Sequence, residues 1–283
     1  MKTISVITVN LNNKEGLEET LKSIRVQSYP KLEHIVIDGG STDGSLDIIR
    51  QHEKNIAYWI SESDKGIYHA MNKGIEVAAG DYLLFLNSGD RLNEPDTISA
   101  AEAELKDADI VYGNIIPTGS NKDMDRWKPG PFTLFDFYKS TLPHSSTFVR
   151  KQVILELGKY NEKYMISSDF DFFLRAFLSG KYSFRYIDVD ISVFNKEGIS
   201  NKPENKKIVE KERRNIIETN FPEAVLPDYD RLFKYSRAET AYGRYGLIWA
   251  MNNRIVRDSI HFLYRLLKRT GICVKRRCFW ENT

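Results

Sequence analysis

Apolar residues recur along the first part of the chain in two alternating patterns. Short runs rich in β-branched and aromatic side chains indicate buried strands, and apolar side chains three and four positions apart indicate helices. Strands are predicted at residues 4–9, 34–37, 56–60, 82–86 and 110–112. Helices are predicted between them at residues 15–28, from Leu46 onward, at 66–79 and at 95–105. This alternation predicts βαβ units and an α/β fold with a mostly parallel sheet.

The regular alternation of strand and helix patterns ends after residue 113. Residues 114–143 combine prolines with aromatic side chains and are predicted to form an irregular loop over the crevice of the sheet. Further along, the pattern predicts helices at 149–157, 168–179 and 203–220, an extended strand at 184–194, and a long helical segment from about 230 to 268. The second part of the chain is therefore expected to be richer in helix than the first.

Composition limits the class of protein. The 283 residues allow one large domain or one domain with an appendage, and 41% hydrophobic with 28% charged residues is an ordinary soluble balance. Cys273 and Cys278 have no second pair and no nearby histidine, so neither a zinc site nor a disulfide framework is predicted, and a reducing, cytoplasmic setting is expected. No three-part signal peptide opens the chain, and no apolar run approaches the ~20 residues that span a bilayer.

The net charge of +2 hides an asymmetry. Residues 231–283 hold 12 Lys+Arg and 3 Asp+Glu, whereas residues 1–230 hold 29 and 36. Aromatic and aliphatic residues alternate with the cations of this basic end, which suits an amphipathic helix lying on an anionic membrane. An apolar face docked on the rest of the chain and a dimer helix are the alternatives. Nucleic-acid binding is not expected.

Polar side chains follow three of the predicted strands. Asn87-Ser88-Gly89-Asp90 comes directly after the run 82–86, and Asp38 and Asp64 follow two earlier strands. Ligands of open α/β sheets bind at the carboxyl ends of the strands, so these side chains are expected to border one crevice. An oxygen ligand beside a glycine suits a divalent cation carrying a diphosphate. The same residue types also form turns and cap helices, which is the structural alternative.

The glycine-rich turn at residues 38–44 does not match the common phosphate-binding motifs. Its glycines at 39, 40 and 44 do not spell the dinucleotide fingerprint, and the turn lacks the Gly-Lys-Ser/Thr of a P-loop. What remains is the Asp38 carboxylate beside glycines that let a ligand approach the backbone. Such a carboxylate can accept hydrogen bonds from a base N–H or a ribose hydroxyl.

Six short motifs occur in order between about residues 3 and 195. They are Ile4-Ser-Val-Ile-Thr-Val-Asn10, Ile35-Val-Ile-Asp-Gly-Gly-Ser-Thr-Asp-Gly44, the stretch 64–74 with Ala-Met-Asn-Lys-Gly, the stretch 80–90, Pro143-His-Ser-Ser-Thr-Phe148, and Ser168-Asp-Phe-Asp171. Together they resemble family 2 glycosyltransferases of the GT-A fold, especially the branch that builds bacterial exopolysaccharide, capsule or O-antigen repeats.

This resemblance implies a Rossmann-like, mostly parallel sheet with flanking helices. It also implies a division of the chain into a GT-A catalytic domain and an appended segment. The catalytic domain is expected at residues 1–200, with a nucleotide-binding half at about 1–113 and an acceptor half at about 114–200. Residues 201–283 are expected to form a helical, basic, amphipathic C-terminal extension.

The resemblance also implies roles for residues that match the family motifs. Asp38 corresponds to the aspartate that contacts the nucleobase, Asp64 to a second nucleoside contact, and Asp90 to the carboxylate that coordinates Mn²⁺ or Mg²⁺. Asn87 and Gly89 stand where the common pattern has carboxylates, so Asp90 is the one clear protein carboxylate for the metal. The nucleotide-sugar-binding residues are expected to be Thr8, Asn10, Asp38, Asp64, Asn87, Ser88 and Gly89.

Asp169 corresponds to the catalytic base of the family, in a motif often written Glu-Asp. Ser168 stands in place of the glutamate, and Asp171 is the second candidate for the base. The structural alternative is that Asp169 caps the helix that begins here. His144 is a candidate contact to the diphosphate or the acceptor, with a purely structural histidine as the alternative.

The expected function is therefore inverting glycosyl transfer that depends on Mn²⁺ or Mg²⁺. The donor would be a nucleotide sugar, with UDP as the default nucleotide and a hexosyl or N-acetylhexosaminyl group to transfer. The acceptor would be a saccharide or a polyprenyl-diphosphate-linked sugar in cell-surface polysaccharide synthesis, reached from the inner face of the membrane. A non-catalytic nucleotide-sugar-binding scaffold and a sugar-nucleotide pyrophosphorylase are the alternatives.

Overall fold

The computed structural model describes residues 1–118 and 126–236. The chain divides into two compact units, Met1–Pro222 and Glu223–Thr283. Of the second unit the structure describes a 3₁₀ turn, η5 (Glu223–Val225), and helical residues 226–236. Of the extension predicted at residues 201–283, residues 201–236 are described, and most of its basic end, residues 237–283, lies outside the described residues. None of the described helices is both long and apolar enough to cross a bilayer.

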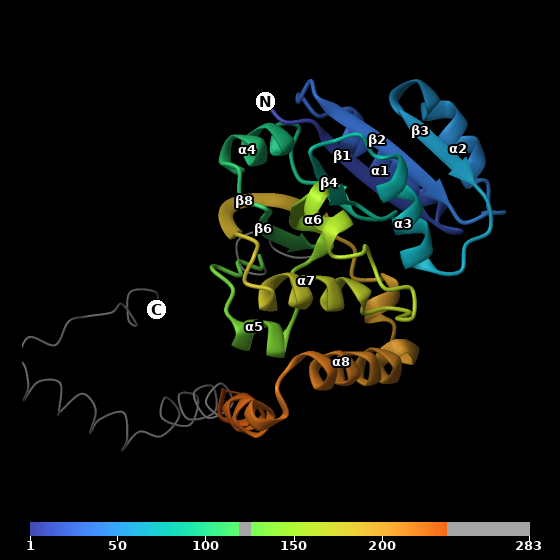
Figure 1. Ribbon diagram of the computed structural model, residues 1–283. Helices are drawn as coiled ribbons and strands as arrows, with labels where there is room; N and C mark the ends of the chain where they lie inside the picture. The colour runs from blue at the N-terminus through green and yellow to red at the C-terminus, as the bar shows by residue number, and fades with distance from the viewer. Residues whose placement is uncertain (119–125, 237–283) are drawn as a thin grey trace, which may run out of the picture. The chain divides into compact units, whose positions relative to one another are not determined.

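The first unit consists of a mixed sheet with helices around it (Figure 1). The described strands are β1 (Ile4–Asn10), β2 (Leu32–Asp38), β3 (Tyr58–Ser61), β4 (Tyr82–Phe85), β5 (Arg91–Leu92), β6 (Ile110–Pro117), β7 (Thr147–Arg150) and β8 (Phe184–Phe194). The described helices are α1 (Lys14–Arg25), α2 (Ser45–His52), α3 (Ile67–Val77), α4 (Thr97–Glu104), α5 (Leu134–Lys139), α6 (Lys151–Glu156), α7 (Ser168–Leu178) and α8 (Lys206–Asn220). Short 3₁₀ turns are η1 (Glu53–Asn55), η2 (His144–Ser146), η3 (Ile199–Asn201) and η4 (Pro203–Asn205).

The described strands form one sheet in the order β3-β2-β1-β4-β7-β6-β8-β5. Strands β3, β2, β1 and β4 run parallel to one another, as do β6 and β8. Strand β7 lies antiparallel between β4 and β6, and β5 is antiparallel to β8. The predicted α/β fold with a mostly parallel sheet is confirmed, and the parallel half contains the βαβ units read from the first 113 residues.

The sequence pattern was wrong at residues 149–157, where it predicted a continuous helix. Phe148 and Val149 belong to β7, and α6 begins only at Lys151. Both apolar side chains are buried because β7 is enclosed between β4 and β6. A short apolar run of this kind has no periodicity that separates a central strand from a helix. Helix α5 likewise lies inside the segment predicted to be irregular.

Helices cover both faces of the parallel half of the sheet. On one face Val36 of β2 packs with Leu17 of α1. Its neighbour Ile35 pairs with Ile7 of β1, so those two side chains point to the opposite face, where α3 lies. Gly74 lets α3 approach closely, since a Cβ at this position would lie 2.5 Å from Cγ2 of Ile7. The strands are therefore buried on both sides, which explains their continuous apolar runs.

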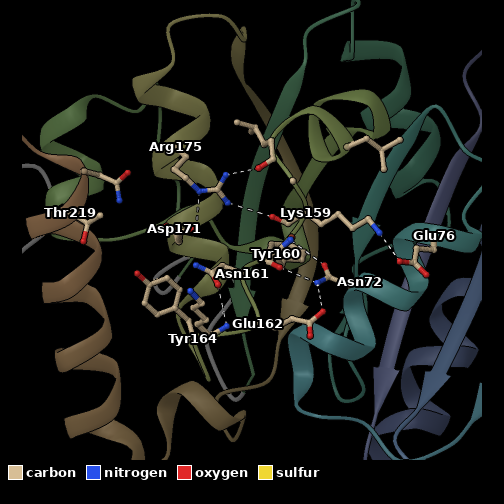
Figure 2. A pocket seen from close by; sticks show the side chains of 15 residues that line it. Asn72, Glu76, Lys159, Tyr160, Asn161, Glu162, Tyr164, Asp171, Arg175 and Thr219 are labelled. Atoms are coloured by element: carbon tan, nitrogen blue, oxygen red, sulfur yellow. Dashed lines mark hydrogen bonds and ion pairs between the residues drawn. The ribbon is translucent and has the colours of Figure 1, made fainter.

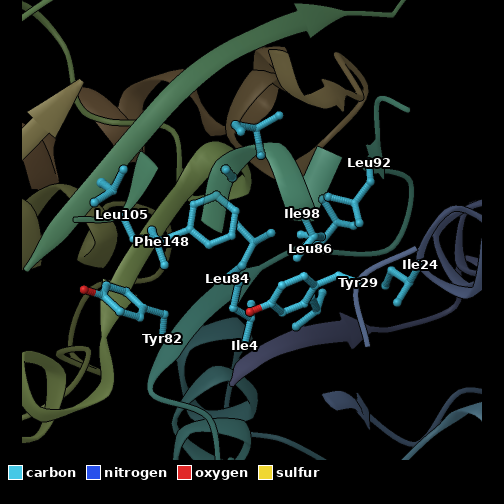
Figure 3. Close-up of a cluster of buried hydrophobic side chains, with 14 of the residues drawn as sticks. Ile4, Ile24, Tyr29, Tyr82, Leu84, Leu86, Leu92, Ile98, Leu105 and Phe148 are labelled. Carbon is cyan, nitrogen blue, oxygen red and sulfur yellow. The ribbon is translucent and has the colours of Figure 1, made fainter. Parts of the chain in front are cut away.

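A hydrophobic cluster fixes the junction between the parallel and antiparallel parts (Figure 3). Ile4 of β1 and Leu84 of β4 meet Ile24 of α1, Ile98 of α4 and Phe148 of β7 in this cluster, and each is at most 4% exposed. Burying one side chain of this size contributes about 1.5–3 kcal/mol. The cluster therefore holds β1 and β4 in a fixed relation to α4 and β7.

Candidate active site

A cleft of about 740 Å³ opens at the carboxyl ends of the parallel strands. Segments following β1 to β4 border it, together with the start of α3, the η2 turn, the start of α7 and the segment after β8. The predicted site residues that line it are Asn10, Asp64, Asn87, Ser88, Asp90, His144 and Asp169. Thr8, Asp38, Gly89 and Asp171 are not among its lining residues.

Asp38 is fully buried behind the cleft, and its carboxylate organises the turn after β2. It accepts hydrogen bonds from the hydroxyls of Ser41 and Ser61, both at 2.6 Å, from the Ser41 amide at 2.9 Å, and from Asn10 Nδ2 at 2.8 Å. Burial alone would raise the pKa of Asp38, but these hydrogen bonds outweigh it and hold the pKa below its ordinary value. Gly39, rather than Asp38, lines the cleft at this point.

Register explains how three strand ends supply this network. Asn10 of β1 pairs with Asp38 of β2, which pairs with Ser61 of β3. Thr8 lies two residues before Asn10 on the same face of β1, and its hydroxyl is 3.1 Å from Nε2 of the buried His34. Thr8 and Asp38 therefore support the floor of the cleft from beneath.

Two oxygen acceptors on residues that line the cleft after β1 and β3 lack a partner within the residues that the structure describes. Because Asn10 Nδ2 donates to Asp38, its amide orientation is fixed and Oδ1 is the buried, unpartnered atom. Asp64 Oδ1 lies 2.8 Å from His69 Nδ1 and 2.7 Å from Lys73 Nζ, whereas its Oδ2 is buried and unpartnered. These two oxygens can accept hydrogen bonds from N–H or hydroxyl groups of a ligand.

A chain of three polar side chains crosses the cleft. His144, at the start of η2, has Nδ1 3.6 Å from Oδ2 of Asp169 and Nε2 3.0 Å from Nδ2 of Asn87. Tyr68 of α3 places its hydroxyl 2.6 Å from the Ile166 carbonyl oxygen and 3.1 Å from Asp169 Oδ1. His144 and Tyr68 therefore contact the Asp169 carboxylate from two sides in the first turn of α7, where it borders the cleft.

Asp90 is 5% exposed and lies on the cleft wall. Burial raises its pKa to about 6, against the opposing effects of the nearby His144 and of the Asn195 amide, which donates to Oδ1 at 2.8 Å. Gly89 has a φ of +100°, and a Cβ there would lie 2.7 Å from Nδ2 of Asn195. A glycine is needed at this position both for its backbone conformation and for the close approach of Asn195.

The donor set fits a divalent cation with few protein ligands. Asp90 supplies a buried carboxylate, and Asn87 Oδ1 is a buried acceptor with no partner in the described part of the chain. Carboxylate and amide oxygens are ligands that Mg²⁺ and Mn²⁺ accept, with phosphates and waters completing the shell. Among the described residues no three His, Cys, Asp or Glu side chains form a metal cluster, so a nucleotide would have to contribute ligands.

The second candidate for the base, Asp171, is turned away from the cleft. Its Oδ2 forms an ion pair with Arg175 Nε at 2.8 Å, and both residues line a separate hollow of about 990 Å³ (Figure 2). Lys159 and Asn72 border the same hollow and are engaged with Glu76 and with the Tyr160 backbone, respectively. Asp169 is thus the carboxylate of the pair that borders the cleft.

Sequence reasoning missed the cleft residues that follow β8. Asn195, Glu197 and Lys202 border the cleft, and the Asn195 amide is the group bonded to Asp90. Residues 195–198 read Asn-Lys-Glu-Gly after an apolar strand, which is the same strand-end signal that identified Asn87 to Asp90. Tyr68 was also missed, because nothing in a helical tyrosine predicts that its hydroxyl reaches a residue about one hundred positions away.

Comparison with known proteins identifies the family. The family model described as glycosyl transferase family 2 matches residues 5–170. The chain is 40% identical over 182 residues to an uncharacterised glycosyltransferase of Mycobacterium tuberculosis, covering 62% of this chain and 69% of the relative. It is 34% identical over 215 residues to a PGL/p-HBAD biosynthesis glycosyltransferase of Mycobacterium bovis, covering 73% of this chain and 82% of the relative.

Solved structures share the fold at low sequence identity. TarS of S. aureus, residues 1–349 in complex with UDP-GlcNAc, has a TM-score of 0.60 at 18% identity, covering 78% of this chain and 68% of that one. The match spans 41% of a longer TarS chain. The mannosyltransferase PcManGT from Pyrobaculum calidifontis, in complex with GDP-Man and Mn²⁺, has a TM-score of 0.55 at 19% identity, covering 91% and 82%.

The predicted GT-A sheet is confirmed by these likenesses. The family model matches more than half of the chain, and the M. bovis relative is matched above 30% identity over most of its length. The chain therefore belongs to glycosyl transferase family 2 and is a glycosyltransferase.

Proposed function

We propose that the cleft transfers a sugar from a nucleoside-diphosphate sugar to an acceptor hydroxyl, with inversion at the anomeric carbon. One observation carries the proposal. Asn87 and Asp169 contact opposite nitrogens of the same imidazole, that of His144. The side chain expected beside the metal-bound diphosphate and the side chain expected as the base therefore flank one histidine on the lining of the same cleft, where a single bound donor and acceptor can meet both.

Asp169 is the proposed base. Its carboxylate accepts the proton of the acceptor hydroxyl while that oxygen attacks the anomeric carbon and the bond from that carbon to the diphosphate oxygen breaks. A single displacement of this kind inverts the configuration, so an α-linked donor gives a β-linked product. His144 and Tyr68 hold the carboxylate in place on its two sides.

Asp90, with Asn87 Oδ1, is proposed to hold Mn²⁺ or Mg²⁺ together with the diphosphate. The cation supplies positive charge to the leaving nucleoside diphosphate. The Mn²⁺ in the PcManGT complex supports this choice of metal. Asn10 Oδ1 and Asp64 Oδ2 are proposed to accept hydrogen bonds from the nucleoside, while Asp38 acts through the turn that carries Gly39.

UDP is the proposed nucleotide, with a hexosyl or N-acetylhexosaminyl group as the sugar. TarS complexes with UDP and UDP-GlcNAc support UDP, and the PcManGT complex with GDP-Man makes GDP the competitor to test. The pathway proposed is the assembly of a cell-surface glycoconjugate or polysaccharide. Relatives named for PGL/p-HBAD biosynthesis and for teichuronic acid biosynthesis support it.

A saccharide carried on an apolar anchor, such as a polyprenyl diphosphate, is the proposed acceptor. Three cleft residues at the rim expose large apolar side chains: Leu11 at 62%, Met165 at 51% and Ile199 at 43%. An apolar rim around a polar cleft suits a substrate with both kinds of surface. The proposed location is the inner face of the membrane, with the basic end of the chain, residues 231–283, as the peripheral contact.

Calorimetric titration tests the donor and the metal. UDP, GDP and dTDP are titrated into the wild type and Asp90→Ala, each with and without Mn²⁺. We expect one nucleotide to bind in a manner that depends on Mn²⁺ and weakens at least tenfold in Asp90→Ala. Binding of none of the three would overturn the proposal.

A second function is favoured by one specific observation, the presence of Asn87 and Gly89 where the family pattern has carboxylates. A protein that binds nucleotide sugars without transferring the sugar would show nucleotide binding and no release of nucleoside diphosphate from any donor. Asp169→Asn separates the two functions. It should abolish turnover while leaving nucleotide binding within about twofold if the chain is an enzyme with this base.

A further inference from the structure

Helix α8 lies beyond the residues that the family model matches, yet it packs against α7, the helix that carries Asp169 (Figure 1). Ile216, on the face of α8 that meets this part of the fold, is fully buried, whereas most of the other side chains of α8 are at least partly exposed. The contact is polar at its centre, where Glu212 stands.

Glu212 accepts hydrogen bonds from three consecutive backbone amides. Its Oε1 receives the N–H of Met165 at 2.6 Å, and its Oε2 receives those of Ile166 and Ser167 at 3.0 and 2.9 Å. These residues lead directly into α7, and Ser167 is its N-cap position without a capping bond from its own side chain. A carboxylate placed at a helix N-terminus is stabilised by the unpaired N–H groups and by the helix dipole.

Neighbouring residues of α8 hold the same segment at further points. Arg213 stacks on the ring of Phe170, with its guanidinium carbon 4.2 Å from the ring centre. The Tyr164 hydroxyl donates to Oδ1 of Asn215 at 3.0 Å. Burial lowers the pKa of Arg213, and the charge of Asp169 acts in the opposite direction. The guanidinium and the carboxylate therefore interact electrostatically. Side chains of α8 therefore contact residues on both sides of Asp169 in the sequence, residues 165–167 before it and Phe170 after it.

We propose that Glu212 is a positioning residue for the catalytic base, acting through the three amides that it holds ahead of α7. The inference rests on the proposed function, since it takes Asp169 as the base. Proton abstraction requires the carboxylate within hydrogen-bond reach of the acceptor hydroxyl. A displacement of about 1 Å at such a group can cost on the order of 100-fold in rate. Donor binding needs Asp64 and Asp90, which Glu212 does not contact.

The test compares Glu212→Ala, Glu212→Gln and Asp169→Asn with a matched control, Glu210→Ala, at an exposed position on the same helix. Release of UDP from UDP-GlcNAc and of GDP from GDP-mannose, with water as the acceptor of the sugar, is measured with Mn²⁺ for the full chain, along with nucleotide affinity. We expect Glu212→Ala to lower kcat by 10- to 100-fold and to leave nucleotide affinity within about twofold. Glu212→Gln, which keeps an acceptor oxygen, should recover part of kcat, and Glu210→Ala should match the wild type.

Hydrogen exchange gives a second readout that does not depend on turnover. The amides of residues 165–167 should exchange faster in Glu212→Ala than in Glu210→Ala, with protection elsewhere unchanged. A general loss of folding would instead raise exchange throughout and weaken nucleotide binding together with kcat, which would overturn the inference.

The assays distinguish a failure of the positioning role of Glu212 from a failure of the base role of Asp169. If Asp169→Asn is inactive and Glu212→Ala keeps wild-type kcat, the positioning role is wrong and the base stands. If Asp169→Asn stays active, the base assignment is wrong and the positioning role falls with it. If the wild type releases neither UDP nor GDP, the proposed function fails first, and the inference built on it fails as well.

Discussion

His144 Nδ1 lies 3.6 Å from Oδ2 of Asp169 at the centre of the cleft. Burial lowers the pKa of His144, but the nearby carboxylate of Asp169, with a further contribution from Asp90, outweighs burial and raises the pKa above its ordinary value. The imidazole is thus tied electrostatically to the proposed base on one side and touches Asn87 on the other. It connects the two halves of the proposed reaction.

We expect His144→Ala to lower kcat by about 10- to 100-fold, because Asp169 loses the group that orients it across the cleft. The KM for the donor should change less than kcat, since Asp64 and Asp90 remain in place. Steady-state release of nucleoside diphosphate measures both. His52→Ala, in a histidine at the end of α2 away from the cleft, is the control. Equal losses in the two variants would remove His144 from the mechanism.

Gly89→Ala should impair both stability and activity. The residue has a φ of +100°, and the new Cβ would lie 2.7 Å from Asn195 Nδ2, so the side chain of the residue whose amide binds Asp90 would have to move. Backbone strain of this kind costs about 1–3 kcal/mol, and the steric clash adds to it. Gly180→Ala separates the two effects, since it has a φ of +63° with open space around it. Urea unfolding and kcat should show a stability loss in both variants and a loss of activity in Gly89→Ala alone.

Asp38→Asn should destabilise the fold by about 3 kcal/mol, because an amide cannot accept all the hydrogen bonds now made by the carboxylate. The folded-state pKa of Asp38 lies below that of the unfolded chain, so its stabilising contribution is present above pH 4 and is lost as the pH falls through the folded-state pKa. Urea unfolding at pH 7 checks the magnitude. Asp47→Asn, on the exposed side of α2, is the control. A variant with unchanged stability and weakened nucleotide binding would instead favour a direct nucleobase contact.

We expect His34 to make the free energy of unfolding decrease as the pH falls below 6.5. Burial lowers its folded-state pKa to about 3, while in the unfolded chain it titrates near 6.5. Between these values the unfolded state takes up a proton that the folded state does not, so unfolding becomes easier as the pH falls, by at most about 1.4 kcal/mol per pH unit. His34→Gln should flatten the dependence of unfolding free energy on pH between 6.5 and 4.5. Parallel curves for the two proteins would contradict this.

The position of the cleft was predictable because parallel strands place their carboxyl ends along one edge. Asn10, Asp64, Asn87 and Asp90 follow successive parallel strands and do meet there. The direction of each side chain was not predictable from the pattern. Asp38 follows the same rule, yet its carboxylate turns inward because Ser41 and Ser61 offer donors on that side.

Contacts between distant parts of the chain could not be predicted from the sequence for a different reason. Periodicity identifies the face of α8 that packs, but it does not say which helix lies opposite. Glu212 and the amides of residues 165–167 are more than forty positions apart, and neither segment alone indicates the other. The end of β7 was taken for the start of a helix because its neighbours on both sides, β4 and β6, are not contained in a local pattern.

The contacts of Glu212 also bear on where the chain can be shortened. A protein ended at residue 200 would keep nearly every side chain that lines the cleft, yet it would release the three amides ahead of α7 into solvent. Donor recognition and chemistry would then become separable by truncation. A fragment that extends to Pro222, the last residue of the first compact unit, keeps the whole of α8 and with it the Glu212 contacts.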